Sequence, residues 1–127
     1  MFLVEDQSVF RDVAKAVLER NAEFTVVGEA ADGAEAIVKC GELSPSVVVM
    51  DVNMPGMGGL EAARRLAAES PDASVVLTSM TAEREYPRLA IEIGAAGFIT
   101  KLALTAQALR ETLNRATPGD SQAPLAA

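Results

Sequence analysis

The sequence predicts an α/β fold in which helices cover both faces of a five-stranded parallel sheet. Two observations support this prediction. Five short apolar segments alternate with five segments in which apolar residues recur every three or four positions. Turn-forming pairs such as Asp32-Gly33, Ser44-Pro45 and Ser70-Pro71 separate them. Regular alternation of strand and helix favours parallel strands, because each helix returns the chain to the edge from which the previous strand began.

The predicted strands are uniformly apolar rather than alternating, which is typical of strands that are buried on both faces. The clearest is Val47 to Met50, three valines and a methionine that run directly into Asp51. In chain order, the predicted strands are residues 2–4, 24–27, 47–50, 75–77 and 97–99.

The predicted helices each place apolar residues on a single face. The first is defined by Val9, Phe10, Val13, Ala14, Val17 and Leu18, and the others are residues 34–43, 60–68, 88–93 and 106–115. Because proline is tolerated only in the first turn of a helix, Pro87 predicts a start near Tyr86 or an irregular first turn. Right-handed crossovers then favour a flavodoxin-like three-layer sandwich with strand order 2-1-3-4-5.

The length of 127 residues fits one domain, which we assign to residues 1–116. Half of the residues are apolar, as expected for a globular core. From Thr117 the sequence TPGDSQAPLAA has no periodicity and predicts a flexible tail or the start of a linker.

Composition excludes several classes of function. The 11 basic and 18 acidic residues give a formal charge of -7, which disfavours direct binding to nucleic acid or to an anionic membrane. The absence of histidine removes histidine catalysis and histidine metal ligands. Cys40 is the only cysteine, so we expect no internal disulfide and a cytoplasmic protein. No apolar run approaches the roughly 18 residues of a membrane span.

Polar side chains follow four of the five predicted strands. They are Glu5-Asp6 after the first strand, Asp51 after the third, Ser79 after the fourth and Lys101 after the fifth. In the order 2-1-3-4-5 these strands are neighbours, and ligands of open parallel sheets bind beyond the carboxyl ends of the strands. Three carboxylates, a hydroxyl group and an ammonium group are therefore expected at one edge of the sheet.

Three clustered carboxylates repel one another unless a cation is present. Oxygen ligands without histidine or cysteine favour Mg²⁺ over zinc, and Mg²⁺ retains coordination positions for phosphate oxygens. Lys101 and Ser79 would bind further phosphoryl oxygens. A carboxylate in this set is a candidate nucleophile for phosphoryl transfer, which would produce an aspartyl phosphate.

Four motifs together resemble the receiver domain of two-component response regulators. They are LVED at 3–6, MDVNMPGMGGLE at 50–61, TS at 78–79 and GAAGFITK at 94–101, and the resemblance extends over residues 2 to 115. MPGMGGLE, together with Leu102 after Lys101, is similar to the NarL/FixJ subgroup, in which a LuxR-type DNA-binding helix-turn-helix domain follows the receiver. The sequence contains no such domain.

The resemblance implies that Asp51 accepts a phosphoryl group from a sensor histidine kinase. It implies that Asp6 ligates Mg²⁺ directly and that Glu5, which replaces the commoner aspartate, does so directly or through water. Asn53 would contribute its backbone carbonyl to the metal.

The resemblance further implies that Ser79 and Lys101 bind the phosphoryl group and that Phe98 is the rotating aromatic residue of a conformational switch. Met80 stands where a small residue is usual, and we expect it to restrict access to the acceptor. The switch would control an output, expected to be transcription, by homodimerisation or by release of an output domain. The only reactions it would catalyse are its own phosphorylation and dephosphorylation.

Other interpretations of these residues remain open. Taken alone, Asp51 could be a turn or cap residue, and Phe98 could be an ordinary core residue. The receiver fold could also serve as a phosphorylation-independent interaction module. A phosphatase of the haloacid dehalogenase type also uses an aspartate at a strand end. Families of that type carry a second aspartate two residues further on, where this sequence has Asn53.

Overall fold

The computed structural model describes residues 1–20, 23–54, 58–81 and 83–116. The predicted tail from Thr117 and the loop residues 55–57 lie outside these ranges. The strands are β1 Phe2–Val4, β2 Gly28–Ala30, β3 Val47–Asp51, β4 Ser74–Ser79 and β5 Gly97–Thr100. The α-helices are α1 Ser8–Glu19, α2 Gly33–Leu43, α3 Gly59–Glu69, α4 Glu85–Glu92 and α5 Ala106–Ala116, with a short 3-10 helix at Lys101–Ala103.

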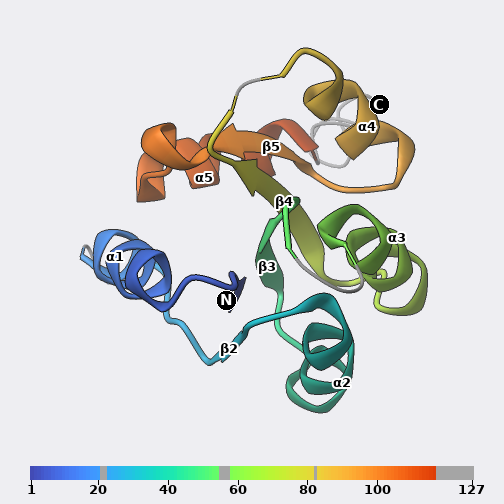
Figure 1. The fold of residues 1–127 in the computed structure, drawn as a ribbon, viewed down its shortest axis with the longest axis horizontal. Helices are drawn as coiled ribbons and strands as arrows, with labels where there is room; N and C mark the ends of the chain where they lie inside the picture. The colour runs from blue at the N-terminus through green and yellow to red at the C-terminus, as the bar shows by residue number, and fades with distance from the viewer. Residues whose placement is uncertain (21–22, 55–57, 82, 117–127) are drawn as a thin grey trace, which may run out of the picture.

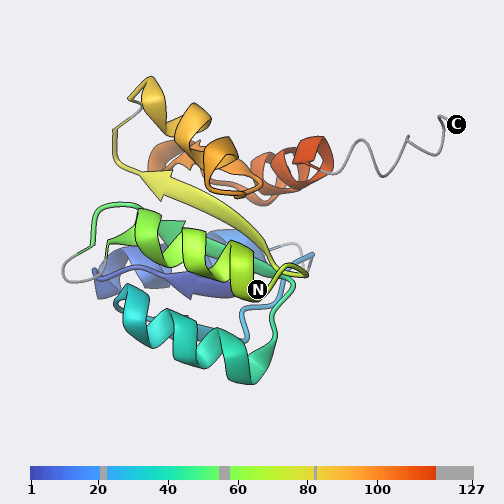
Figure 2. The same ribbon diagram turned by 90° about the vertical axis from the view of Figure 1, so that its right-hand side faces the viewer.

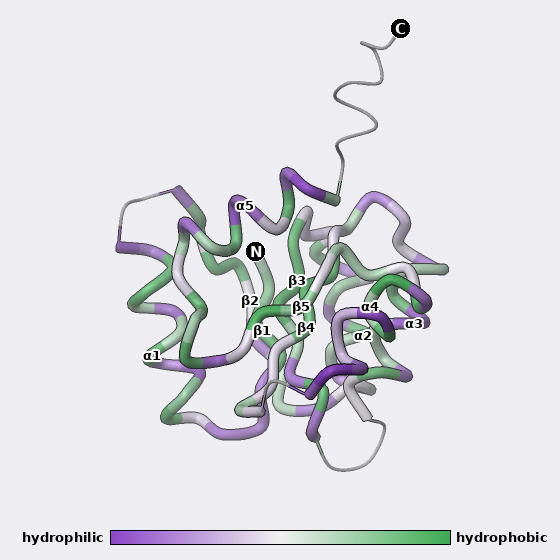
Figure 3. Tube along the Cα trace, turned by 90° about the horizontal axis from the view of Figure 1, so that it is seen from above, coloured by the Kyte–Doolittle hydropathy of each residue, from purple (hydrophilic) through white to green (hydrophobic). Residues whose placement is uncertain are grey.

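The five strands form one parallel sheet in the order β2-β1-β3-β4-β5, which confirms the predicted flavodoxin-like fold. Helices α1 and α5 cover one face of the sheet, and α2, α3 and α4 cover the other (Figures 1 and 2). Figure 3 shows hydrophobic residues concentrated along the central strands and hydrophilic residues on the outer helices.

Each face of the sheet has its own buried core. Small residues of the helices on the α2–α4 side, including Ala36, Ala62 and Ala63, pack against β-strand side chains such as Met50 and Leu77. On the α1 and α5 side, the core is built from residues such as Leu3, Leu18, Val49, Val76 and Leu109. The uniformly apolar strands therefore bury side chains in both directions, as a parallel sheet requires.

The second strand differs from its predicted position. The apolar residues 24–27 precede β2, which begins only at Gly28. The reason is the register of the sheet, which pairs Phe2 to Val4 of β1 with Gly28 to Ala30. The Met1 ammonium group donates to the carbonyl oxygen of Thr25, and Val27 N donates to that of Met1, both at 2.8 Å. Residues 24–27 therefore contact Met1 but lie outside the regular ladder.

The other elements match their predicted positions to within three residues at each end. Helix α4 begins at Glu85, so Pro87 occupies its first turn, where a missing N–H costs no hydrogen bond. Strands β3 and β4 extend to Asp51 and Ser79, and these residues lie opposite Thr78 and Thr100 respectively. The described helices include none that is both long enough and apolar enough to cross a membrane.

Candidate functional site

The strand register brings the predicted site residues together at the carboxyl edge of the sheet. Asp51 ends β3, Glu5 directly follows β1, Lys101 directly follows β5 and Ser79 ends β4. These four side chains are buried, with residue exposures of 3%, 4%, 8% and 0% respectively, whereas Asp6 is exposed. Removing two carboxylates and one ammonium group from water is costly. The stability of this buried group therefore depends on how closely the opposite charges pair.

Lys101 links the two buried carboxylates. Its Nζ lies 2.7 Å from Glu5 Oε1 and donates a hydrogen bond to Asp51 Oδ2 at 3.2 Å. Burial acts to lower the pKa of Lys101, but the two carboxylates outweigh it and the net effect is a raised pKa. Lys101 is therefore a charged ammonium group at neutral pH, placed to attract an anionic ligand.

Glu5 is the second buried carboxylate beside Lys101. Burial raises its pKa, and the nearby charge of Asp51 acts in the same direction, while the contact with Lys101 opposes both. Its Oε2 accepts a hydrogen bond from Gln7 N at 3.2 Å. Its Oε1 is buried and lies against Lys101 Nζ at 2.7 Å. This oxygen therefore already faces one cation, the Lys101 ammonium group.

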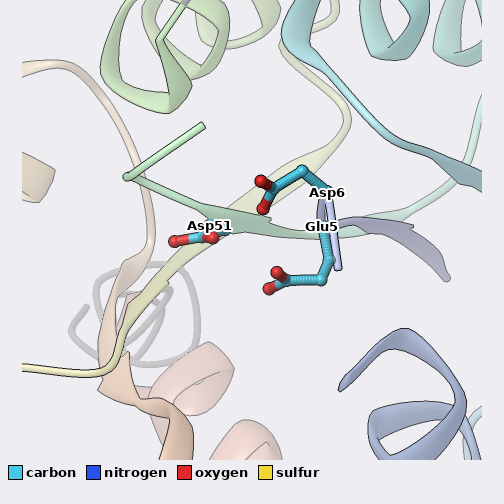
Figure 4. Close-up of side chains that lie close together, drawn as sticks. All are labelled: Glu5, Asp6 and Asp51. Atoms are coloured by element: carbon cyan, nitrogen blue, oxygen red, sulfur yellow. The ribbon is translucent and has the colours of Figure 1, made fainter. Parts of the chain in front are cut away.

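Glu5, Asp6 and Asp51 form an acidic group that could hold a metal ion. Each contributes one carboxylate oxygen, and these oxygens lie within 4.8 Å of one another. Figure 4 shows the three carboxylates pointing into the same region from the ends of β1 and β3. The donor set consists of carboxylate oxygens without nitrogen or sulfur, so these residues fit a hard divalent ion such as Mg²⁺.

Asn53 connects the acceptor strand to the hydroxyl group of Ser79. Its backbone N donates to Asp51 Oδ1 at 3.0 Å, and its side-chain Nδ2 donates to Ser79 Oγ at 3.1 Å. Ser79 Oγ also accepts from Thr81 N at 3.2 Å. The carboxylate and the hydroxyl are thus held by neighbouring loops. The metal-ligand role of the Asn53 carbonyl stays a prediction.

Phe98 and Met80 lie at the periphery of this site. Phe98 is half-buried on β5 and packs against the Tyr86 ring, with the ring centroids 5.2 Å apart. Met80 directly follows β4 and is 58% exposed. The structure thus leaves the Met80 side chain in solvent beside the site, outside both cores. The switch role of Phe98 and the access role of Met80 stay predictions.

Two residues of α1 contact the site although the sequence pattern gave no sign of it. The Phe10 ring centroid lies 4.7 Å from Lys101 Nζ. Arg11 Nη1 donates to the carbonyl oxygen of Glu5 at 2.6 Å, and its Nε pairs with Glu29 Oε1 at 3.3 Å. In the sequence, Phe10 is simply one of several apolar residues on the inner face of a helix.

Comparison with known proteins agrees with this geometry. The family model of the response regulator receiver domain matches residues 1–114. Response regulator GacA of Pseudomonas protegens is 41% identical over 101 residues, which is 80% of this chain and 47% of the relative. Response regulator UvrY of Escherichia coli K12 is 36% identical over 101 residues, 80% of this chain and 46% of the relative. The chain thus spans about half the length of these relatives.

Solved structures give the same result. A LuxR-family two-component response regulator from Aurantimonas superposes with a TM-score of 0.82 at 32% identity, covering 92% of this chain and 84% of that one. The signal receiver domain of NarL from Mycobacterium tuberculosis superposes with a TM-score of 0.80 at 30% identity, covering 91% and 94%. Together with the acidic group at the carboxyl edge of a 2-1-3-4-5 sheet, these matches show that the chain belongs to the family of response regulator receiver domains.

Proposed function

We propose that this receiver domain takes a phosphoryl group from a sensor histidine kinase onto Asp51. The observation that carries the proposal is the buried Asp51 carboxylate at the carboxyl edge of the sheet. It accepts a hydrogen bond from Lys101 and lies beside the carboxylates of Glu5 and Asp6. In the transfer, an Asp51 carboxylate oxygen attacks the phosphorus atom. The phosphorus–nitrogen bond to the kinase histidine breaks, and its electron pair stays on the imidazole.

The residues around Asp51 provide positioning and electrostatic stabilisation. The Asn53 N–H orients the carboxylate through its bond to Oδ1. Lys101 and Ser79 are placed to donate to oxygens of the incoming phosphoryl group. Glu5, Asp6 and Asp51 would hold Mg²⁺, with the Asn53 carbonyl as a further ligand. When bound, Mg²⁺ would neutralise charge on the phosphoryl oxygens.

Phosphorylation would then shift the domain between two conformations. Ser79 would exchange its bonds with Asn53 and Thr81 for one to the phosphoryl group, and Phe98 would turn inward from Tyr86. The face formed by α4, β5 and α5 would change as a result. The acyl phosphate can shift this equilibrium only through contacts that differ between the two states.

The proposed output is control of transcription in the cytoplasm, exerted through homodimerisation or through a helix-turn-helix domain outside this sequence. Direct binding of nucleic acid by the receiver is disfavoured by its formal charge of -7. The domain would act as a catalyst only on its own phosphorylation state. Sedimentation and amide exchange with and without beryllofluoride test the switch, and identical results in both states would refute it.

Incubation with acetyl phosphate and Mg²⁺, followed by intact mass measurement, tests the acceptor assignment. We expect a lasting gain of one phosphoryl group in the parent protein and none in Asp51→Asn, whose amide is nearly isosteric but is not a carboxylate nucleophile. Equal labelling of both proteins would show that Asp51 is not the acceptor. An unlabelled parent would favour the inert interaction module, and rapid turnover of many phosphoesters would favour the phosphatase.

A further inference from the structure

We propose that Phe10 is a positioning residue for Lys101 and that the face of its ring holds the ammonium group in the acceptor site. The proposal rests on the proposed function of Asp51 as phosphoacceptor. It is motivated by the 4.7 Å distance from Lys101 Nζ to the ring centroid. This is within the range of a cation–π interaction, and such interactions strengthen when the cation is desolvated. The Lys101 side chain is only 5% exposed.

The ring differs in kind from the other two neighbours of the ammonium group. Glu5 Oε1 and Asp51 Oδ2 are charged atoms that belong to the acidic group. Both carboxylates change their interactions when a divalent ion or a phosphoryl group enters the site, and both then attract Lys101 less strongly. The Phe10 ring takes no part in such binding. It therefore remains as a constant partner for the ammonium group throughout the transfer.

The position of the ring is fixed by the fold. Phe10 lies on α1 and is half-buried against the core that contains Leu18 and Leu109. Lys101 directly follows β5 and opens the 3-10 helix that leads to Leu104, a buried member of the same core. The helix that carries the ring and the segment that carries the ammonium group thus pack into the same core. Positioned cations contribute to transfer because they need no reorganisation when charge develops on the phosphoryl group.

The alternative is that Phe10 only packs in the core. The two roles can be distinguished by changing the charge on the ring face, because only a cation–π contact depends on it. Site-specific replacement of Phe10 by 4-fluoro-, 3,5-difluoro- and pentafluorophenylalanine nearly preserves its size while progressively removing negative charge from the ring face. The quantity measured is the rate constant of phosphoryl incorporation from acetyl phosphate in saturating Mg²⁺. We expect a stepwise fall that reaches about tenfold in the pentafluoro protein. The dissociation constant of Mg²⁺ should change by less than about twofold, since the acidic group is untouched.

Phe24 provides a matched control. It is also half-buried and packs against the same core, but no contact with a cation is found for it among the described residues. Phe10→Leu and Phe24→Leu should both lower the melting temperature, because each removes aromatic packing. Only Phe10→Leu should slow incorporation, by about tenfold. Equal rates along the fluorinated series, or equal slowing by the two leucine variants, would overturn the proposal.

The reactivity of Lys101 separates this inference from the proposed function. In the unphosphorylated protein, acetylation of Lys101 by an N-hydroxysuccinimide ester should be several-fold faster in Phe10→Leu than in the parent or in Phe24→Leu, as measured by peptide mass. If the parent accepts no phosphoryl group, the function of Asp51 is refuted, and the acetylation rates alone decide the role of Phe10. Equal acetylation of Lys101 in all three proteins would then refute the positioning role.

Discussion

Replacement of Gly59 by alanine tests how closely α3 must approach the strand that carries the acceptor. Gly59 is the first residue of α3 and is buried. A Cβ atom built on it would lie 2.0 Å from the carbonyl oxygen of Asp51 and 2.7 Å from Val52 Cα. These are backbone atoms next to a central strand, so no side-chain rotation relieves the overlap. The start of α3 would have to move away from β3 by more than about 1 Å, since ordinary contacts begin near 3.4 Å.

The expected loss of stability in Gly59→Ala follows from the rigidity of that backbone contact. Overpacking a core lowers the free energy of unfolding by about 1–3 kcal/mol, and by more when the neighbouring atoms cannot move. Alanine recovers at most about 1 kcal/mol of helix propensity. We therefore expect Gly59→Ala to lower the free energy of unfolding by about 2–3 kcal/mol and the melting temperature by about 10 °C. Phosphoryl incorporation should also slow, because the backbone of Asp51 is displaced.

Gly41→Ala is the control, since it is the same chemical change without a clash. Gly41 lies in the interior of α2, is exposed and has nothing within 4 Å of an added Cβ. Here alanine should raise the free energy of unfolding by about 0.5–1 kcal/mol. Urea and thermal unfolding of both variants measure the difference. A Gly59→Ala protein as stable as the parent would refute the close approach of α3 to β3.

Two further predictions concern the metal and the lifetime of the acyl phosphate. Saturating Mg²⁺ should stabilise the parent by about 2.7 kcal/mol at a hundredfold excess over its dissociation constant, as followed by the melting temperature. Asp6→Ala should remove most of this effect and Glu5→Ala should weaken it, whereas a melting temperature indifferent to Mg²⁺ would argue against the metal site. Met80→Ala should shorten the lifetime of the acyl phosphate without changing Mg²⁺ affinity, because water then approaches the phosphorus more freely. Equal decay of parent and variant in saturating Mg²⁺ would show that Met80 does not restrict access.

The sequence alone determined the order of the elements and the set of residues at the carboxyl edge. Hydrophobic periodicity is a local property, so alternating strands and helices are visible in the chain itself. Right-handed crossovers then limit the strand order, and that order makes the ends of β1, β3, β4 and β5 neighbours. The proximity of Glu5, Asp51 and Lys101 could therefore be predicted without coordinates.

The position of β2 was predicted wrongly because local hydrophobicity does not specify which residues find a pairing partner. Residues 24–27 are more apolar than Gly28–Ala30, yet Gly28–Ala30 is the segment that pairs with Phe2 to Val4 of β1. Register in a sheet is decided by the partner strand and by the packing of both faces. This information is spread over segments that are distant in the sequence.

Only the tertiary structure decided how the site is supported. The contact of Phe10 with Lys101 and the bond from Asn53 to Ser79 join residues that lie far apart in the chain. The approach of Gly59 to the Asp51 carbonyl depends on how α3 docks on β3. Such contacts depend on side-chain rotamers and on ångström-scale packing of whole elements, to which hydrophobic periodicity is insensitive. The chemical groups of the site can thus be found in the sequence, whereas the contacts that hold them in place arise only when the layers pack together.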